Sequence, residues 1–412
     1  MVEKILSTKS KTDAHAGDYV VAEYDCIFAH AGNRPLVPEV FTKMGMEKIK
    51  YPEKAVFLAD HTPNSPSVTI AHSEKTIREF AWSHQTRFHD LGEGICHMVL
   101  PEKGYVLPGE IAIGTDSHAC TYGALGALGT GIGSSDEVCA LVSGQMWFRV
   151  PSTIKLTLNG KLPEGVSAKD LIVYLIRRYG TDFAIYKAVE FAGPAIRALS
   201  MDGRFTMCNM GVEMGAKIGY MEVDDVTREW ISEHTDRPYE PVFSDPDCVF
   251  EQEITLDVSN LVPQVVFPPS LKHVESITDI EKTPVFIGII GSCTNGRLED
   301  LQIAANILKG KKIAPGRRLY VIPGSKEIYL KALNSGVITT FVEAGALIGM
   351  PGCNGCGGVF AVPDDGETVI STVNRNSSFR KGNKKADVYL GSPATVAASM
   401  IAGEIADPRN YI

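Results

Sequence analysis

Three features are scarce in this sequence: long apolar runs, an apolar leader and clustered positive charge. No window approaches about 18 uninterrupted apolar residues, so we expect no membrane-spanning helix. The N-terminal stretch MVEKILSTKSKTDAHAGD lacks the apolar core of a signal peptide. The 40 Lys and Arg residues are outnumbered by 49 Asp and Glu residues, and the one basic run, FRKGNKK at 379–385, is short. Nucleic-acid binding requires clustered positive charge, so we expect a cytoplasmic protein that binds neither nucleic acid nor a membrane.

The chain is not rich in cysteine either, because nine cysteines in 412 residues are an ordinary fraction. Without an export signal, this number argues against a disulfide framework. Cysteines in a reducing compartment act more often as core residues, metal ligands or catalysts. We expect six of them to be small buried residues, namely Cys26, Cys96, Cys120, Cys139, Cys208 and Cys248.

Short apolar runs alternate with helical patterns along the chain, and this alternation predicts α/β layers. AVFLAD at 55–60 and GEIAIGTDSH at 109–118 are predicted to be strands that end in polar residues. SEKTIREFAWSH at 73–84 is predicted to be a helix with Ser73 as its N-cap. A chain of 412 residues is too long for one ordinary domain. The sequence pattern changes at Pro151 and again in a proline-rich stretch at 262–282. These changes predict structural units at 1–150, 151–280 and 281–412.

Three cysteines lie in sequence contexts that suit metal binding or redox chemistry. Cys293 follows the apolar strand VFIGII and a Gly-Ser turn, whereas Cys353 and Cys356 lie in the glycine-rich loop MPGCNGCGG at 350–358. A thioredoxin-like pair is disfavoured, because the glycines oppose the helix start that lowers a thiol pKa. A structural zinc site normally has four ligands in two close pairs. Three thiolates on a cubic iron–sulfur cluster would leave one iron open as a Lewis acid. On spacing alone, a cluster, a zinc ion and cysteines without a metal all stay open.

Histidines and carboxylates occur together in three places after apolar runs. Ligand-binding residues of α/β sheets gather at the carboxyl ends of strands, and a carboxylate orients an imidazole as proton donor or acceptor. Taken singly, each histidine can equally be a hydrogen-bonded core or surface residue, but their joint placement favours catalysis. The candidates are Asp60 and His61, His97 in GICHMVLPEKG, and the triplet Asp116, Ser117 and His118.

Two further segments could bind anions or nucleotides. NRNSSFR at 374–380 places Arg375 and Arg380 in a polar loop, where a planar guanidinium suits a carboxylate and an ordinary surface loop is the alternative. GALGALGTGIGSSDE at 123–137 contains a GxGxxS pattern, but it does not directly follow a strand as a dinucleotide fingerprint would. We interpret the glycine-rich segment as a place of tight helix packing.

Several motifs together make the chain resemble the aconitase family, and within it the large subunits of isopropylmalate and homoaconitase-type dehydratases. They are GTDSHACTYGALGALGTGIGSSD, CNMGVEMGA, GSCTNGRLEDL, the downstream Cys-x-x-Cys and NRN followed by Arg380. The resemblance covers essentially the whole chain. It implies three-layer α/β/α domains around a central cluster site, and it favours the iron–sulfur interpretation of the three cysteines.

The resemblance also implies roles for single residues. The ligands of a 4Fe–4S cluster with one open iron would be Cys293, Cys353 and Cys356. The groups that protonate the departing hydroxyl and tune bound water would be Asp60, His61, His97, Asp116 and His118, with Glu213 near the open iron. The asparagines beside the cluster would be Asn209 and Asn374. The substrate-binding residues would be Ser117, Arg375 and Arg380.

Enzymes of this family dehydrate a 2-hydroxy acid and rehydrate the alkene, so the resemblance implies a hydro-lyase. The expected substrate is 3-isopropylmalate in leucine biosynthesis, with citramalate, 2,3-dimethylmalate and homoaconitate as alternatives.

The stretch AHAGNRPLVPEVF at 29–41 departs from the relatives and could direct His30 or Arg34 toward the substrate. The motif Cys-Asn-Gly-Cys also departs from the common Cys-Gly-Pro-Cys, with both thiols retained. A cluster-free RNA-binding protein and a zinc scaffold are the non-enzymatic alternatives, and a net charge of −9 argues against the first.

Full-length aconitases carry a further swivelling domain with the serine that removes the C–H proton. The present sequence ends at residue 412, soon after GSPATVAASMIAGEI. We therefore expect the swivelling domain and its serine base on a separate small subunit of roughly 160–200 residues, the size of one added domain.

Overall fold

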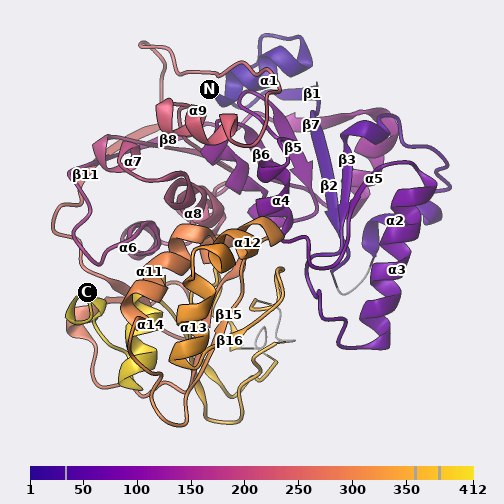
Figure 1. Cartoon of the computed structure of the whole chain (residues 1–412). Helices are drawn as coiled ribbons and strands as arrows, with labels where there is room; N and C mark the ends of the chain where they lie inside the picture. The colour runs from indigo at the N-terminus through magenta and orange to yellow at the C-terminus, as the bar shows by residue number, and fades with distance from the viewer. Residues whose placement is uncertain (33–34, 357–359, 379–381) are drawn as a thin grey trace.

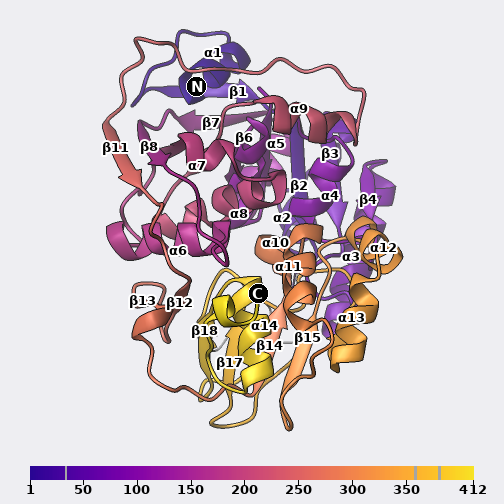
Figure 2. The same ribbon diagram turned by 60° about the vertical axis from the view of Figure 1, so that its left-hand side comes forward.

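The computed structural model describes residues 1–32, 35–356, 360–378 and 382–412. The chain is organised around three larger β-sheets, and each sheet with its helices is called a region below; along the chain the colour runs from indigo through magenta and orange to yellow (Figure 1). A second view, turned by 60°, shows the same three regions in contact (Figure 2). A two-stranded sheet accompanies the first of them.

The first sheet has five parallel strands in the order β4-β3-β2-β5-β6. Its strands β3 and β5 are buried along their whole length. Continuous apolar strands of this kind are typical of parallel sheets with helices on both faces. The strands are β2 (Cys26–His30), β3 (Ala55–Leu58), β4 (Arg87–His89), β5 (Ile111–Gly114) and β6 (Leu128–Gly131). The helices around them are α1 (Val2–Ser10), α2 (Leu36–Lys43), η1 (Pro52–Lys54), α3 (Val68–Ser83), α4 (Cys96–Glu102), η2 (Ser117–Leu125) and α5 (Ser134–Ser143).

A short antiparallel ribbon of β1 (Tyr19–Glu23) and β7 (Gln145–Arg149) closes this first region. A four-stranded parallel sheet follows, in the order β10-β9-β8-β11. Its strands are β8 (Thr153–Asn159), β9 (Ala188–Ala192), β10 (Ile218–Tyr220) and β11 (Gln252–Asp257). Its helices are α6 (Ala168–Tyr179), α7 (Pro194–Arg197), α8 (Met201–Gly211), η3 (Val212–Met214) and α9 (Asp225–Ser232).

The third sheet has seven strands in the order β13-β12-β18-β17-β14-β15-β16. The five strands from β18 to β16 are parallel, and β12 joins them antiparallel. The strands are β12 (Gln264–Val266), β13 (Val274–Ser276), β14 (Ile287–Ile290), β15 (Arg318–Val321), β16 (Leu347–Ile348), β17 (Thr368–Ser371) and β18 (Asp387–Leu390). The helices are η4 (Ile277–Asp279), α10 (Ser292–Asn295), α11 (Leu298–Leu308), α12 (Lys326–Asn334), α13 (Val337–Ala344), α14 (Pro393–Ala402) and η6 (Pro408–Asn410).

The alternation of strands and helices confirms the expected α/β class. The proposed division at 150 and 280 stays a prediction. The strands β12 and β13 bear on its second boundary, because both precede residue 281 but belong to the third sheet. Within the described residues, no helix combines the length and the apolarity that crossing a membrane would need.

The helix predicted at 73–84 has a different start. It begins at Val68, and its N-cap is Ser67, whose hydroxyl accepts a hydrogen bond from the Ile70 amide at 3.3 Å. Ser73 lies inside the helix, where its buried hydroxyl donates to the carbonyl of Ala31 at 2.9 Å. The prediction of Ser73 as the N-cap was therefore wrong. Ser65, Ser67 and Ser73 all precede the periodic pattern, and cap preference alone does not distinguish them.

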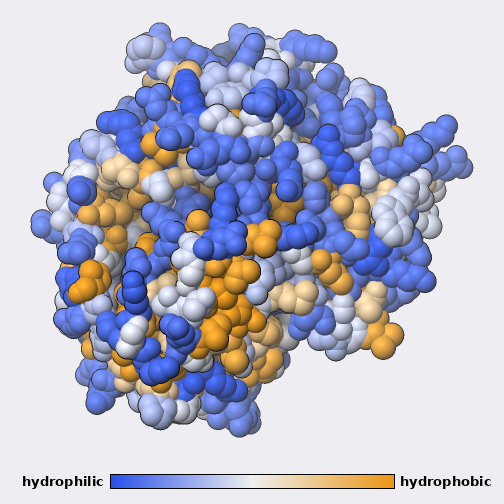
Figure 3. Space-filling model, in the orientation of Figure 1, coloured by the Kyte–Doolittle hydropathy of each residue, from blue (hydrophilic) through white to orange (hydrophobic). Residues whose placement is uncertain are grey.

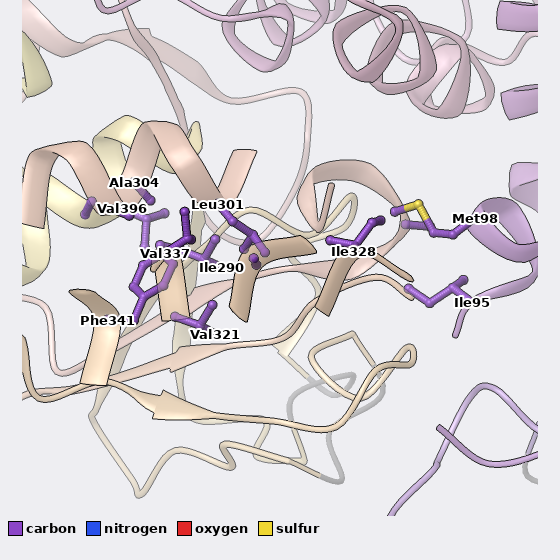
Figure 4. Close-up of a cluster of buried hydrophobic side chains, with 14 of the residues drawn as sticks. Ile95, Met98, Ile290, Leu301, Ala304, Val321, Ile328, Val337, Phe341 and Val396 are labelled. Atoms are coloured by element: carbon purple, nitrogen blue, oxygen red, sulfur yellow. The ribbon is translucent and has the colours of Figure 1, made fainter. Parts of the chain in front are cut away.

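The apolar core crosses the borders between the sheets. One cluster combines Ile95, the N-cap of α4, and Met98 within α4 with Ile290 of β14 and residues of α11 to α14 (Figure 4). This packing fixes the first region against the third, which matters because the candidate site lies between them.

At the surface, most of the face in Figure 3 is hydrophilic, with an apolar area over α13 and β16 where Val342 and Leu347 are exposed.

Four of the six cysteines expected in the core are buried, namely Cys26, Cys96, Cys120 and Cys208. The expectation was wrong for Cys139, which is exposed on α5, and Cys248 is only partly buried. Cys139 lies on the solvent-facing side of α5, and the other side of that helix is buried. Its exposure is therefore set by its position on the helix and not by the small, apolar character of its side chain.

Candidate functional site

The first sheet brings the predicted Asp–His residues to one edge. Strands β2, β3 and β5 are parallel neighbours, and their carboxyl ends lie side by side. His30 ends β2, Asp60 follows β3, and Asp116 follows β5. The strand order therefore explains why residues far apart in sequence meet at this edge.

Asp116 is the centre of this group. One of its carboxylate oxygens, Oδ1, accepts from His97 Nε2 at 3.0 Å and from the His118 amide at 2.7 Å. The other oxygen, Oδ2, lies 3.5 Å from His61 Nε2 and 3.7 Å from His30 Nε2. A single carboxylate thus orients several imidazole rings around one point.

Asp60 and His61 form a second carboxylate–imidazole pair. His61 Nδ1 lies 2.7 Å from Asp60 Oδ1, and Asp60 Oδ2 accepts from the Cys96 amide at 2.9 Å. The ring of His30 stacks on that of His61 with centroids 3.7 Å apart. His30 was one of two residues expected to face the substrate, and Arg34, the other, lies outside the described residues.

A third group joins the first region to the other two. His118 Nε2 lies 3.0 Å from Glu213 Oε1, and the same oxygen accepts from Arg375 Nε at 2.7 Å. Arg375 Nη2 also donates to the hydroxyl of Ser117 at 3.2 Å. Glu213 comes from η3 and Arg375 from the segment after β17, so this cluster connects all three sheets.

The three candidate metal-binding cysteines line the same cavity as the Asp–His residues. Cys293 lies in α10, directly after the fully buried Ser292, whose φ of 77° is strained for a residue with a side chain. The amide of Cys353 donates to the carbonyl of Asp60 at 2.8 Å. Gly352 allows this approach, because a Cβ there would lie 2.8 Å from that oxygen.

Asn374 lies between two of these cysteines. Its amide nitrogen donates to Cys293 Sγ at 3.4 Å, and its amide oxygen accepts from Cys356 Sγ at the same distance. Asn209 lies deeper, where it donates to the hydroxyl of Thr121 and accepts from that of Thr294. Arg380, predicted to bind substrate, lies outside the described residues.

The cavity between these groups has a volume of about 600 Å³, enough for a small acid together with an inorganic group. Its wall combines thiols with imidazoles, a hydroxyl and a guanidinium. The lining residues include His30, His61, His97, Asp116, Ser117, His118, Cys293, Cys353, Cys356, Asn374 and Arg375.

Charges in the site are strongly coupled. Burial would raise the pKa of Asp60, but its charge attraction and hydrogen bond to His61 lower it to about 2. Burial would lower the pKa of His61, but Asp60 and Asp116 raise it to about 10. Burial and the neighbouring His61 lower the pKa of His30 to about 4. The stacked pair therefore carries one positive charge rather than two at neutral pH.

Sequence reasoning did not assign two buried residues that support the site. Arg297 donates from Nη2 to the carbonyl of His97 at 3.3 Å, and its guanidinium lies 4.1 Å from the ring centroid of Phe205. Tyr122 places its hydroxyl 3.3 Å from His97 Nδ1. Arg297 ends the motif GSCTNGR, and Tyr122 follows GTDSHACT. Their proximity to these motifs is the sequence signal that could have indicated a role in the site.

Proteins of known sequence resemble the chain along its whole length. It is 45% identical over 414 aligned residues to "3-isopropylmalate dehydratase large subunit 1" of Methanopyrus kandleri, covering 100% of this chain and 99% of the relative. It is 46% identical to "3-isopropylmalate dehydratase large subunit 2" of Archaeoglobus fulgidus, with the same coverage. It is 43% identical to the "Probable methanogen homoaconitase large subunit" of Methanosarcina mazei, covering 95% of this chain and 100% of the relative.

One solved structure has the same fold. The holo-form of aconitase X from Thermococcus kodakaraensis superposes with a TM-score of 0.52 at 11% identity, covering 89% of this chain and 86% of that one. A sequence model of the aconitase family (aconitate hydratase) matches residues 57–285 and 270–403. From these matches, the chain belongs to the aconitase family.

Proposed function

We propose that the chain is the cluster-bearing large subunit of a hydro-lyase that interconverts 2-isopropylmalate and 3-isopropylmalate in leucine biosynthesis. Family membership and the names of relatives at 41–46% identity support this activity. The observation that carries the proposal is the shared cavity, which is lined by thiols from two distant segments together with carboxylate-bound imidazoles and an arginine. A homoaconitase-type activity is the second candidate, because one relative carries that name.

The three cysteines fit an iron–sulfur cluster in their chemistry. Burial raises the pKa of the Cys293 thiol to about 12. The pKa of Cys353 is also raised, first by its hydrogen bond with the Cys356 thiol and then by burial. Buried thiols without a cation stay protonated, whereas metal binding releases these protons and stabilises thiolates. In this proposal Cys293, Cys353 and Cys356 hold a 4Fe–4S cluster, while Asn374 orients two of the sulfur atoms.

When bound, such a cluster supplies a Lewis-acidic iron without a protein ligand, which can polarise hydroxyl and carboxylate oxygens. The imidazoles of His61, His97 and His118 line the same cavity, each held in orientation by a carboxylate. We assign them to the delivery of a proton to the departing hydroxyl and to its recovery in the reverse step. Asp60 and Asp116 fix the ring orientations, because each accepts from a backbone amide and an imidazole.

The substrate is a dicarboxylate, so its carboxylate groups need positive partners. Arg375 uses Nε for Glu213 and Nη2 for Ser117, which fixes the plane of its guanidinium at the cavity wall. A planar guanidinium with further N–H groups suits a carboxylate oxygen pair. We assign Arg375 to carboxylate binding, with Ser117 as its neighbour, and we propose the same role for Arg380.

The relatives are named large subunits, and we propose a separate small subunit for this chain as well. In the proposal, the small subunit carries the swivelling domain and the serine that removes the C–H proton. A cytoplasmic location, where thiols stay reduced, is part of the proposal.

The test is to reconstitute the chain anaerobically with iron, sulfide and the small subunit of its own operon or genome. Alkene absorbance is then followed with isopropylmalate, citramalate, dimethylmalate and homoaconitate. The proposal expects the highest kcat/KM with isopropylmalate, whereas a preference for homoaconitate would favour the second candidate. No turnover with any of the four, from protein that has incorporated iron and sulfide, would overturn the assignment.

Cys353→Ser tests the metal assignment. We expect this variant to lose visible cluster absorption and turnover, because an alcohol is a poor substitute for a soft thiolate. Cys139→Ser is the matched control, since Cys139 is exposed on α5 and lies outside the cavity. Full turnover by Cys353→Ser would remove Cys353 from the ligand set.

A further inference from the structure

Lys169 is a buried lysine that contacts the segment bearing two site residues. It is 1% exposed and lies at the start of α6, in the second region. Its Nζ donates to the carbonyl of Thr372 at 2.9 Å and to the carbonyl of Val373 at 2.8 Å. These two carbonyls directly precede Asn374 and Arg375.

The position of Lys169 is unfavourable for the helix itself. The start of α6 already has a capping box formed by Ser167 and Asp170, and a helix N-terminus repels positive charge. Burial also disfavours the ammonium and lowers the pKa of Lys169 to about 8. A helix former without charge would serve α6 better, so the benefit of this lysine lies in the two carbonyls that it binds.

The same two-residue segment is tied to the turn before Cys293. The hydroxyl of Thr372 accepts from the Gly291 amide at 2.9 Å and donates to the Gly291 carbonyl at 3.1 Å. Lys169 therefore holds a segment that contacts the cysteine-bearing turn on one side and continues into Asn374 and Arg375 on the other. Two adjacent carbonyls bound by one ammonium leave the peptide between them little freedom to rotate.

We propose that Lys169 is a positioning residue, which fixes the backbone at Thr372 and Val373 and thereby sets Asn374 against the cysteines and Arg375 in the substrate cavity. It touches neither group itself. The consequence for catalysis rests on the proposed function, whereas the consequence for backbone order does not.

The first experiment measures amide hydrogen exchange in the chain alone, without metal or partner. In Lys169→Met, we expect exchange in a peptide covering 372–376 to rise by about tenfold, because the local segment opens more easily. Exchange in a peptide covering β8 should stay unchanged. Lys54→Met is the matched control, because Lys54 also donates to a carbonyl, that of Tyr24 at 2.9 Å, away from the cavity.

The second experiment measures kinetics of the reconstituted enzyme. We expect Lys169→Met to lower kcat/KM by about 10- to 100-fold, since small displacements of positioned groups have effects of that size. KM should rise with it because Arg375 is displaced, and the thermal midpoint should fall by no more than in Lys54→Met. Lys169→Arg retains N–H donors and a charge, and it should recover part of both the exchange protection and kcat/KM.

Unchanged exchange at 372–376 in Lys169→Met would overturn the proposal, whatever the activity. A fall in kcat/KM accompanied by an equal rise of exchange throughout the chain would also overturn it, because that pattern indicates general destabilisation. If Lys169→Met does not fold, Lys169→Gln is measured by the same two criteria. An inactive wild-type enzyme with the expected exchange result would count against the proposed function alone.

Discussion

At the scale of single residues, the site is organised by carboxylates that each serve more than one partner. Glu213 accepts from both His118 and Arg375, and burial of this carboxyl would raise its pKa, whereas these two cations lower it. Glu213 thereby stays ionised and holds both cationic groups at fixed positions. The orientation of Arg375 follows from this ion pair rather than from the loop sequence around it.

Arg375→Lys tests the geometric part of this argument. An ammonium retains the charge but loses the planar fork and one of the two fixed contacts. We expect KM for the hydroxy diacid to rise by about tenfold or more, equivalent to about 1.4 kcal/mol, with a smaller change in kcat. Steady-state kinetics of the reconstituted enzyme would measure this. Arg178→Lys is the control on the exposed face of α6, and kinetics of Arg375→Lys that match it would exclude Arg375 from substrate binding.

Part of the site was predictable at this scale. Asp60 and His61 are adjacent in sequence and form the pair that their proximity predicts. Asp116 and His118 are also neighbours, and Asp116 Oδ1 accepts from the His118 amide at 2.7 Å. The ring of His118 lies between two carboxylates, with Nδ1 3.5 Å from Asp116 Oδ1 and Nε2 3.0 Å from Glu213 Oε1. Sequence proximity therefore predicted which of these residues lie close together, and it did not determine which atoms they would use.

At the scale of elements, close backbone packing positions η2, which carries His118 at its start. A Cβ on Gly123 would lie 1.6 Å from the carbonyl oxygen of Gly219 in β10. The glycine-rich segment was interpreted as a place of tight packing, and this approach confirms the interpretation. Backbone contact without side chains lets η2 lie directly against the second sheet.

Gly123→Ala is therefore expected to destabilise the protein by at least about 3 kcal/mol, since backbone cannot yield to an added methyl group as a side chain can. Gly211→Ala is the matched variant, because a Cβ at that helical position meets nothing closer than 3.8 Å. We expect it to stay within about 1 kcal/mol of the wild type. Denaturant unfolding followed by circular dichroism measures both, and equal stabilities would show that η2 can move away from β10.

At the scale of the whole molecule, a buried carboxyl lies at the border between the first and third regions. Glu102 ends α4, and its carboxylate accepts from the hydroxyl of Ser325, the N-cap of α12, at 2.7 Å. Burial, with a smaller effect of Glu327, raises the pKa of Glu102 from 4.5 to about 7. The folded protein therefore holds this proton more tightly than the unfolded chain does.

The sign of the pH effect follows from this difference. The stabilising contribution of Glu102 is present below its unfolded pKa and is lost as the pH rises through the folded pKa, so ionisation at higher pH destabilises the fold. Glu102→Gln keeps an acceptor for Ser325 without a charge. Its stability relative to the wild type should rise from near zero at about pH 4 to about 3 kcal/mol at about pH 8. Unfolding midpoints across this range provide the measurement, and a constant difference would show that folding does not raise the pKa of Glu102.

A further expectation at this scale concerns the partner. The purified chain alone should show no turnover after cluster reconstitution, and adding a small subunit of roughly 160–200 residues should restore it. The reason is that the proposal places the serine base on the small subunit, whereas Ser117, the serine among the described residues that line this cavity, is assigned to substrate binding. Alkene formation by the single chain would contradict the proposed division of labour between two subunits.

The sequence by itself determined the class of the fold, the kinds of residue in the site and the family. These properties depend on local patterns: apolar strands that end in polar residues, and motifs that keep their order along the chain. Only the tertiary structure decided which distant groups meet. Arg375 lies 162 residues from Glu213, and Lys169 lies 203 from Thr372, yet each pair is in contact. Such contacts depend on how three sheets pack around one cavity, and packing of this kind leaves no local periodicity in the sequence.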